Sequence, residues 1–372
     1  MKPNGEMQPR RTRGKYVFVT GASGFVGEHF VNALLEQDPE VNIYELRRSP
    51  VKNHLPRVQP VFGDITQDGV LSGEVRRQLC RTIDEIWHIA GDTNLVNDDP
   101  TNEQQLLTTN VGGTRNLLAF ALECSNLRCF NHLSTAYVNG SRDTPVPEER
   151  VSALAWRNPY ERSKILAEHA VLNSVLPWRV FRPSIIVGDS KTGQSDNKGV
   201  YAVANSLRAV RDYFVRTSID PATRRVRILA KPDVLKNLIP INYVVQTLLA
   251  LRNHDAPTSC LYHITNPTPI SVREVIGMIA ECLGLRRLDF VSAFSDTTHG
   301  TKVERALNRM LLSVYGPYVL GNDPIFMRHN TDHVLALAGR PDLTPPPIDA
   351  HLFRFLLMSH YNQREVSRAA AG

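Results

Sequence analysis

The sequence predicts an α/β protein with a doubly wound parallel sheet and a smaller, mostly helical C-terminal lobe. From residue 15 to about 187, short β-prone runs alternate with helical patterns, which implies βαβ units and a parallel sheet. Beyond residue 188 this alternation loosens, and 372 residues are many for one simple domain. We therefore expect a disordered tail at 1–14, a sheet domain at 15–187 to which 237–265 returns, and a lobe built from 188–236 and 266–372.

The first strand is expected at Tyr16 to Val19, and three glycines follow it at three-residue spacing. Apolar residues then recur in steps of three and four, as in a helix that starts near Phe25. Gly21 can take the unusual φ of a tight turn, and Gly24 lets backbone N–H groups approach phosphate oxygens. Gly27 lets the helix lie close to the strand. The spacing departs from the usual GxGxxG, but the arrangement predicts a site for a dinucleotide pyrophosphate. A structural strand–turn–helix corner is the alternative.

The following elements alternate as such a sheet requires. Strands are expected at 41–46, 58–62, 85–90 and 128–133, helices at 103–123 and 159–172, and a sixth strand at 178–181 and 185–187 that Pro183 interrupts.

The lobe begins with a loop at 188–199, which is rich in Gly, Asp, Ser and Lys. Many prolines in the last third of the chain predict short helices and loops there. An apolar stretch at 351–361 would contact the lobe, or else lipid or an acyl chain. The other expected elements are helices at 200–215, 242–251 and 271–283 and strands at 226–230 and 261–264.

The composition excludes several classes of protein. No apolar run approaches the 18 residues that span a bilayer, and no stretch resembles a signal peptide, so we expect a cytoplasmic protein. The net charge is +6, but no nucleic-acid-reading module accompanies it, and we expect no nucleic-acid partner. Five scattered cysteines without a CxxC pair predict free thiols and no metal site.

Charged side chains follow the second and third strands. A carboxylate after the second strand suits the ribose 2′-hydroxyl of NAD, whereas an arginine suits the 2′-phosphate of NADP. Arg47 or Arg48 occupies this position, which favours NADPH, although Glu45 is close enough to leave NAD open. Asp64 could accept a hydrogen bond from the adenine amino group, or it could cap its own loop.

Tyr160 and Lys164 lie four residues apart on an expected helix, so both side chains share one face. A tyrosine with its ordinary pKa near 10 is a poor acid–base group at pH 7, and a nearby ammonium lowers that pKa. The spacing therefore predicts an acid–base pair, with a surface pair as the alternative.

Two further polar positions accompany this pair. Thr135, after Ser134, ends the fifth strand and could polarise a substrate oxygen or form a turn. Asn110 begins Asn-Val-Gly-Gly-Thr within a helical stretch, where two glycines indicate a close backbone approach or a kink.

In order and spacing, this set resembles the extended short-chain dehydrogenase/reductase superfamily, which has a Rossmann fold. The resemblance covers residues 16 to about 265 and includes the 25-residue interval from Thr135 to Tyr160. It implies catalytic roles for Thr135, Tyr160, Lys164 and Asn110. It also implies that NADP contacts Gly21, Ser23, Gly24, Phe25, Val26, Gly27, Arg47, Arg48, Asp64, Ile65, Ala90, Tyr160, Lys164, Pro183 and Ser184.

A narrower resemblance, to thioester reductases and fatty acyl-CoA reductases, lies in three segments: His88 to Asn94, Ser134 to Val138, and Arg182 to Gly193. Gly91 replaces the second alanine usual in this branch. The lobe is only loosely similar, through Tyr315-Gly-Pro-Tyr318 and Asn330-Thr331. The resemblance implies NADPH-dependent reduction of an acyl thioester, on CoA or an acyl carrier protein, to an aldehyde or alcohol. It also leaves room for a homodimer.

Under this hypothesis, Thr135 and Tyr160 hydrogen-bond the thioester carbonyl, and Tyr160 delivers the proton. Lys164 tunes Tyr160 and binds the nicotinamide ribose, and Asn110 supports Lys164 through a water molecule. Two alternatives remain. One is a keto/hydroxy dehydrogenase or nucleotide-sugar epimerase or dehydratase using the same triad, and the other is a non-enzymatic nucleotide sensor.

Overall fold

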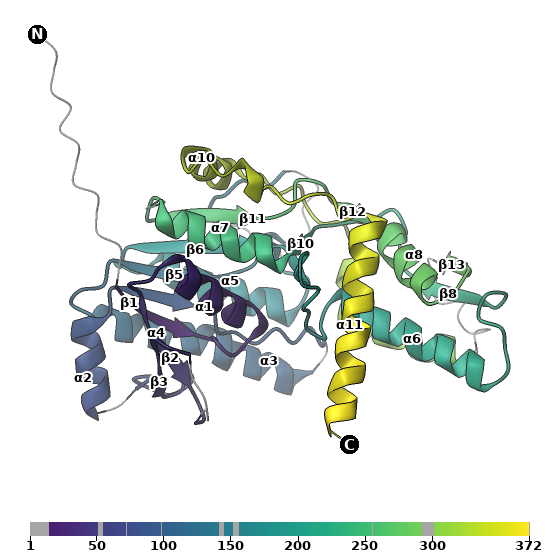
Figure 1. The fold of residues 1–372 in the computed structure, drawn as a ribbon, viewed down its shortest axis with the longest axis horizontal. Coiled ribbons are helices and arrows are strands. Elements are labelled where there is room, and N and C mark those ends of the chain that lie inside the picture. The colour runs from purple at the N-terminus through teal and green to yellow at the C-terminus, as the bar shows by residue number, and fades with distance from the viewer. Residues whose placement is uncertain are drawn as a thin grey trace, which may run out of the picture.

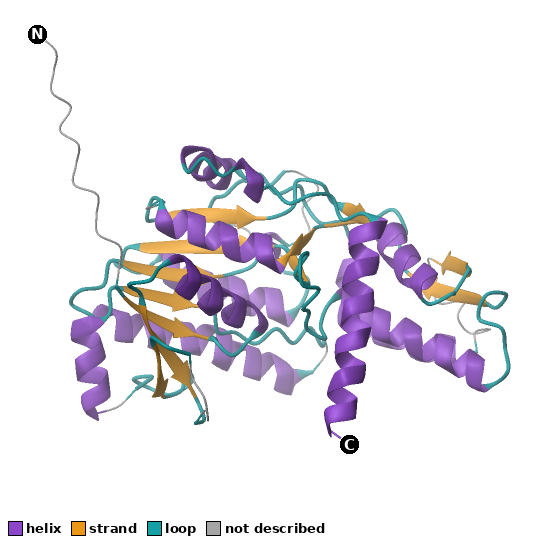
Figure 2. Cartoon of the chain, viewed as in Figure 1, coloured by secondary structure: helices purple, strands orange, loops and turns teal. Residues whose placement is uncertain are grey.

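The computed structural model describes residues 15–50, 55–71, 73–97, 99–140, 145–151, 156–254, 256–291 and 301–371, so the expected tail at 1–14 lies outside the described residues. Within these ranges, seven strands form one parallel sheet in the order β11-β6-β5-β4-β1-β2-β3 (Figures 1 and 2). The predicted doubly wound parallel sheet is therefore confirmed. Its strands are β1 (Tyr16–Thr20), β2 (Asn42–Arg47), β3 (Val58–Phe62), β4 (Glu85–His88), β5 (Cys129–Leu133), β6 (Trp178–Pro183) and β11 (Cys260–Ile264).

Helices cover both faces of this sheet (Figure 1). Val17 and Val19 of β1 belong to one buried cluster with helices α1 and α7, whereas Phe18 belongs to the cluster on the other face. This split follows from the two-residue period of a strand. The helices are α1 (Phe25–Gln37) and α7 (Ile241–Asn253) on one face, and α2 (Gly73–Thr82), α3 (Pro100–Leu106), α4 (Gly113–Leu122) and α5 (Pro159–Leu172) on the other.

The helix expected at 103–123 is interrupted by a π-helical segment, Leu107–Gly112, between α3 and α4. Asn110 lies within it, and such segments often occur at functional sites. A Cβ on Gly113 would lie 2.8 Å from Cδ1 of Ile65, so this glycine permits a close approach to the loop after β3. Both the irregularity and the close approach were indicated by the two glycines.

The prediction of one sixth strand interrupted by Pro183 is wrong. Pro183 ends β6 in the main sheet, and β7 (Ile185–Val187) pairs instead with β10 (Leu238–Pro240). The backbone N–H of Ser184 still donates to Ile264, but that of Ile185 donates to Asn237. The chain therefore leaves the sheet at the proline and enters the lobe.

The lobe encloses its own core among helices α6 (Val200–Arg216), α8 (Val272–Cys282), α9 (Lys302–Val319) and α11 (Ala350–Ala371). The expectation of short helices in the last third is wrong for α9, with 18 residues, and α11, with 22. Pro317 lies near the end of α9, where a proline interrupts little of a helix. The small strands are β8 (Arg225–Leu229), β9 (Leu235–Lys236), β12 (Ile270–Ser271) and β13 (Arg287–Val291).

The apolar stretch at 351–361 contributes to this core. Phe353, Leu356 and Leu357 are each 1% exposed, which supports packing rather than lipid contact. The helix α10 (His329–Leu337) instead contacts α7 and β11. The division of the chain into domains stays a prediction.

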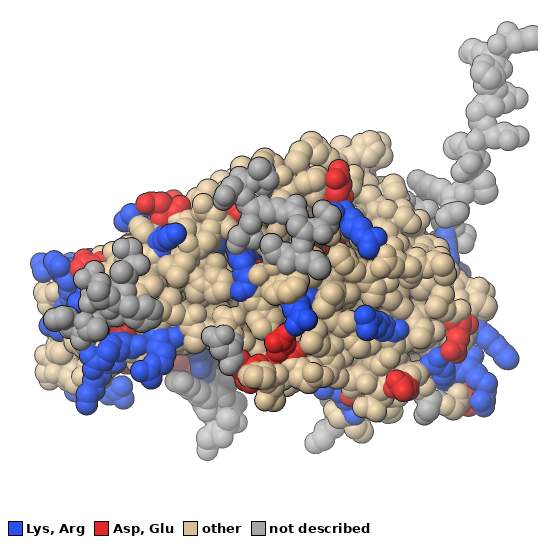
Figure 3. All heavy atoms as spheres, turned by 180° about the vertical axis from the view of Figure 1, so that it is seen from behind, with Lys and Arg blue, Asp and Glu red and all other residues tan. Residues whose placement is uncertain are grey.

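On the face opposite that of Figure 1, Lys and Arg of the described residues lie at both ends of the molecule, and acidic side chains lie among them (Figure 3). All five cysteines are free thiols, and in the described part of the chain no group of His, Cys, Asp or Glu could hold a metal. Among the same residues, no helix combines the length and apolarity needed to cross a membrane.

A buried ion pair joins α5 to the sheet. Glu168 accepts two hydrogen bonds from the Arg182 guanidinium, at 2.5 and 3.1 Å, and neither side chain is exposed. Glu168 also accepts a hydrogen bond from Ser134 at 2.7 Å. Removing one charge of such a pair leaves the other uncompensated in a medium of low polarity.

We expect Glu168→Gln to lower the free energy of unfolding by about 3 kcal/mol, because the Arg182 charge would stay buried without a counterion. Urea unfolding measures the change, with Glu36→Gln on the exposed side of α1 as the matched control. Equal stabilities of the two variants would contradict the role of this pair.

Candidate active site

One cavity of about 990 Å³ lies where the carboxyl ends of the strands meet the lobe. Its lining includes all the residues expected to contact a cofactor and all the expected catalytic residues except Asn110: Gly21, Ser23, Gly24, Phe25, Val26, Gly27, Arg47, Arg48, Asp64, Ile65, Ala90, Thr135, Tyr160, Lys164, Pro183 and Ser184. The fold thus brings together residues from Gly21 to Ser184, which are 163 positions apart in the chain. Their functional roles stay predictions.

The glycine turn follows the central strand β1, at the point where the strand order reverses. Gly21 has φ +74°, and a Cβ there would lie 2.5 Å from the backbone nitrogen of Ala90, which follows β4. A Cβ on Gly27 would overlap the carbonyl oxygen of Gly21. Gly24 precedes α1, and no side chain caps that helix. The turn therefore leaves N–H groups facing a crevice between β1 and β4, which suits a phosphate.

A buried chain of hydrogen bonds runs below this turn. Thr114 donates to the carbonyl of Asn110 at 2.6 Å, so its oxygen must accept the Nε2 proton of His88, 2.9 Å away. Nδ1 of His88 then accepts from Thr20 at 2.8 Å. Burial lowers the pKa of His88 to about 3, which agrees with a neutral ring at pH 7. This series of hydrogen bonds connects the end of β1 to the π-helical segment.

Asn110 fastens the loop after β4. Its side-chain oxygen accepts the N–H of Asp92 at 2.7 Å, and its amide donates to the Asp92 carbonyl at 2.9 Å and to Ser163 Oγ at 2.8 Å. Asn110 is therefore hydrogen-bonded directly to Ser163, the residue before Lys164 in the sequence. A Cβ on Gly91 would lie 3.2 Å from the Asn110 oxygen, so a glycine fits this tight loop more easily than an alanine.

Charged residues lie at the carboxyl end of β2 and directly after it. Glu45 is buried and accepts a hydrogen bond from Nε of Arg47 at 2.6 Å, and it does not line the cavity. Arg47 and the exposed Arg48 do line it. Glu45, the carboxylate that could have bound the ribose of NAD, is thus paired with Arg47 instead.

Asp64 caps its own loop, the second of its two sequence-based interpretations. Its Oδ1 accepts from the backbone N–H and the hydroxyl of Thr66, both at 2.9 Å. It also lines the cavity, so an adenine contact stays a prediction. Ile65 beside it lines the same end and touches Gly113.

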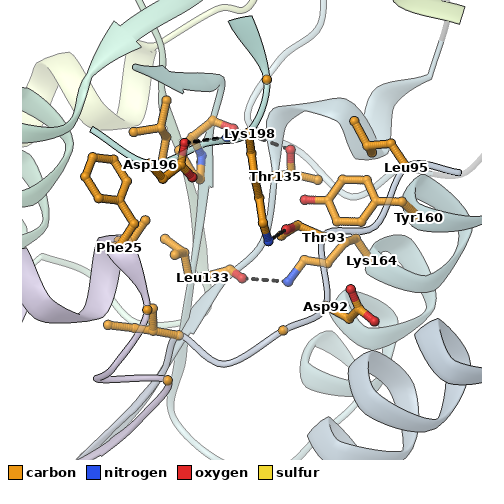
Figure 4. Close-up of a pocket in the computed structure, with 18 of the residues that line it drawn as sticks. Phe25, Asp92, Thr93, Leu95, Leu133, Thr135, Tyr160, Lys164, Asp196 and Lys198 are labelled. Atoms are coloured by element: carbon orange, nitrogen blue, oxygen red, sulfur yellow. Dashed lines mark hydrogen bonds between the residues drawn. The ribbon is translucent and has the colours of Figure 1, made fainter. Parts of the chain in front are cut away.

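Thr135 and Tyr160 point into the same space (Figure 4). Thr135 accepts the N–H of Tyr137 at 3.3 Å, as a residue that begins a turn does, and its hydroxyl donates to the carbonyl of Pro183 at 3.5 Å. Burial raises the pKa of Tyr160 to about 12, and the contact with Thr135 opposes this rise. The net shift is therefore upward, against the expectation of a lowered pKa, because loss of solvation dominates. A protonated tyrosine is a proton donor.

Lys164 is buried, and its Nζ donates to the carbonyl of Leu133 at 2.8 Å. Burial lowers its pKa to about 8, although the Glu168 carboxylate opposes this change. Its ammonium is thus held at the end of β5, because Leu133 is the last residue of that strand. The other N–H groups of the ammonium can donate to a ligand.

Several lining residues were missed by the sequence analysis. Lys198, on the loop before α6, crosses the cavity and donates to Thr93 Oγ1 at 2.6 Å (Figure 4). Asp196 accepts the backbone N–H of Lys198 at 3.0 Å. Thr93 and Asp92 follow β4, so their place at the carboxyl edge could have been inferred as it was for Thr135. The loop at 188–199 carried no such signal.

The part of the cavity formed by the lobe has an apolar wall, beside polar side chains that include Lys236, Tyr315 and Tyr318. Its wall combines residues of β10, α6, α8 and α9: Val200, Val203, Leu238, Val272, Val275, Ile276 and Val319. Where the two parts meet, Pro183 and Ser184 line the cavity, and Ser184 Oγ is buried without a hydrogen-bond partner in the structure. Such a group accommodates a ligand that supplies the missing hydrogen bond.

A family model described as "Male sterility protein" matches residues 19–55 and 44–248, more than half of the chain. Fatty acyl-CoA reductase 1 of Gallus gallus is 27% identical over 305 residues, which cover 65% of this chain and 55% of that protein. A nonribosomal peptide synthetase of Aspergillus hancockii is 23% identical over 396 residues, covering 93% of this chain and 36% of the synthetase. This chain therefore spans only part of these longer relatives.

Among solved structures, the terminal R domain from the myxalamid PKS-NRPS biosynthetic pathway has a TM-score of 0.77 and 22% identity. The match covers 95% of this chain and 92% of that domain. At this identity the similarity establishes a common fold, including the lobe.

Proposed function

The chain belongs to the male sterility protein family, and we propose that it is an NADPH-dependent reductase of acyl thioesters carried on CoA or on a carrier protein. One observation carries the proposal. The uncapped glycine turn, the hydroxyls of Thr135 and Tyr160 and an apolar wall all face one cavity. A reductase of acyl thioesters needs these three surfaces together, for cofactor, carbonyl and acyl chain.

The residues present fit a dinucleotide cofactor. A side chain on Gly21 or Gly27 would collide with backbone, so these glycines keep the turn tight, and the uncapped helix N-terminus after Gly24 would receive a ligand's phosphates. Arg47 and Arg48 would hold the 2′-phosphate, because a guanidinium binds phosphate with paired hydrogen bonds. Ser184 would supply the nicotinamide end with a hydrogen-bonding hydroxyl.

When bound, the reduced nicotinamide supplies a hydride to the thioester carbon. Thr135 and Tyr160 stabilise the charge that develops on the carbonyl oxygen, since preorganised donors act most strongly where charge appears. Tyr160 then gives up its proton to that oxygen, and the Lys164 ammonium stabilises the resulting phenolate and binds the cofactor ribose. The hemithioacetal breaks its C–S bond and releases a thiol and an aldehyde, which a second reduction would convert to the alcohol.

The apolar wall favours an acyl chain over a nucleotide sugar. Its seven aliphatic side chains offer no hydrogen bonds to the hydroxyls of a sugar. Burial of a hydroxyl without a hydrogen-bond partner is unfavourable and would weaken sugar binding. The alternative of an epimerase or dehydratase using the same triad is therefore less well supported by this cavity.

The direct test is incubation of the protein with NADPH and a panel of acyl-CoAs and acyl-pantetheines of different length, with an aldehyde trap. We expect NADPH oxidation matched by trapped aldehyde or by alcohol. Tightly bound NAD that copurifies, with no net oxidation of added NADPH, would favour an epimerase instead.

We expect Arg48→Ala to raise the KM for NADPH about tenfold and to leave the KM for NADH unchanged, because a charge-assisted hydrogen bond to phosphate contributes about 1.4 kcal/mol. Initial rates with both cofactors measure this effect. Arg115→Ala, at an exposed position on α4 outside the cavity, is the control. A wild-type preference for NADH would overturn the assignment.

The rate should fall as pH rises through about 8. Lys164 has a pKa of about 8, so its stabilising ammonium is present below this pH and lost above it. Tyr160, with a pKa of about 12, keeps its proton throughout this range. The pH dependence of kcat between 6 and 10 measures this limb, and a flat profile would contradict a role for the Lys164 charge.

A further inference from the structure

Tyr160 lies in the first turn of α5, where a helix is held least firmly. It is the second residue of the helix, and the N–H groups of a first turn have no partners within the helix. Asn158 caps this turn, since its side-chain oxygen accepts the N–H of Glu161 at 2.9 Å. The position of the Tyr160 hydroxyl therefore depends on what fixes Asn158 and Glu161.

One hydroxyl from the lobe contacts both of these residues. Tyr318, on α9, accepts a hydrogen bond from the Asn158 amide at 2.8 Å and donates to Oε1 of Glu161 at 3.0 Å. Asn158 lies two residues before Tyr160 and Glu161 directly after it. Burial raises the pKa of Tyr318 well above its usual value, so the hydroxyl keeps the proton that it donates. Tyr318 also lines the cavity beside Tyr160.

A buried guanidinium strengthens this contact. Arg157 lies between two aromatic rings, 4.5 Å from the centre of the Tyr318 ring and 5.1 Å from that of Tyr137. Its guanidinium approaches Glu161 to 2.8 Å, and its backbone N–H donates to the same carboxylate at 2.9 Å. Cation–π contacts gain strength when they are shielded from water, as this one is.

Charges in this cluster balance. Asp323 lies 3.6 Å from Arg157, and it accepts hydrogen bonds from Lys236 and from the Tyr137 hydroxyl, both at 2.6 Å. With Glu161, the cluster holds two cations and two carboxylates, and all four side chains are less than 10% exposed. Because loss of one member leaves an uncompensated charge, such a cluster favours a single arrangement of the elements that it joins.

We propose that Tyr318 is a positioning residue for Tyr160, and that the C-terminal lobe thereby completes the catalytic geometry as well as the substrate wall. The Tyr318 hydroxyl holds both sides of the helical turn that carries Tyr160, and Arg157 and Asp323 hold Tyr318 and its partners. The catalytic consequence of this inference rests on the proposed reductase function, but its structural consequence does not.

The test uses the full-length protein with Tyr318→Phe, which removes the hydroxyl and keeps the ring against Arg157. Tyr213→Phe, on the exposed side of α6, is the matched control. Hydrogen–deuterium exchange of the peptide spanning 156–166 reports the first turn of α5 without any substrate. We expect its amides to exchange about tenfold faster in Tyr318→Phe and at the wild-type rate in Tyr213→Phe. Unchanged exchange in Tyr318→Phe would overturn the proposal.

Kinetics provide the second readout. Misplacing a catalytic group by a fraction of an ångström slows the chemical step, so we expect kcat to fall about tenfold in Tyr318→Phe, with the Kd for NADPH within twofold of wild type. A parallel loss of cofactor affinity would indicate a general structural defect and overturn the positioning role. Absence of turnover in the wild type would instead count against the proposed function, and the exchange result would still decide the inference.

A double-mutant cycle separates this contact from others. Asn158→Ser keeps an oxygen that can cap the helix and removes the amide that donates to Tyr318. If the two residues act through one contact, the double variant loses little more activity and protection than Tyr318→Phe alone. Losses that multiply would contradict a shared contact.

Discussion

The site depends on one constraint, the close approach of the two segments that directly follow β1 and β4. The backbone nitrogen of Ala90 comes so near to Gly21 that no side chain fits on this glycine. The same close approach opens a crevice at the carboxyl edge of the sheet, where α1 presents its uncapped N-terminus. The neutral His88 and its hydrogen-bonded neighbours hold the two segments from below. Thr135 and Lys164 are then fixed because β5 lies next to β4.

Much of the sheet could be predicted from the sequence because its signals are local. The run of buried β-prone residues in β1, the glycine spacing and the helix at 159–172 depend on residues that are neighbours in the chain. The family match confirms the resemblance to reductases of this branch. The division of 178–187 between two sheets could not be predicted, because the partner of β7 lies some 50 residues downstream. The lengths of α9 and α11 were hidden by prolines, because Pro317 lies within the last turn of α9 and the prolines at 345–347 shortly precede α11.

Site residues could be predicted where they follow strands, as Thr135 does, or share one face of a helix, as Tyr160 and Lys164 do, and most of those that the lobe supplies were missed. Tyr318 and Lys198 act across distances that no spacing rule covers. The raised pKa of Tyr160 could not be predicted from the sequence, because the Tyr–Lys spacing indicates a nearby ammonium but does not indicate burial. Burial prevails in the structure and keeps the phenol protonated. This suits the proton donation that we propose for Tyr160.

We propose that Tyr160 supplies this proton in a site where cofactor binding does not depend on its hydroxyl. The most direct measurement is single-turnover hydride transfer from NADPH to an acyl thioester by Tyr160→Phe, alongside the Kd for NADPH. We expect the rate to fall at least about 100-fold, in the range typical of a lost general acid, while the Kd stays within about threefold of wild type. A rate within about threefold of wild type would contradict the account.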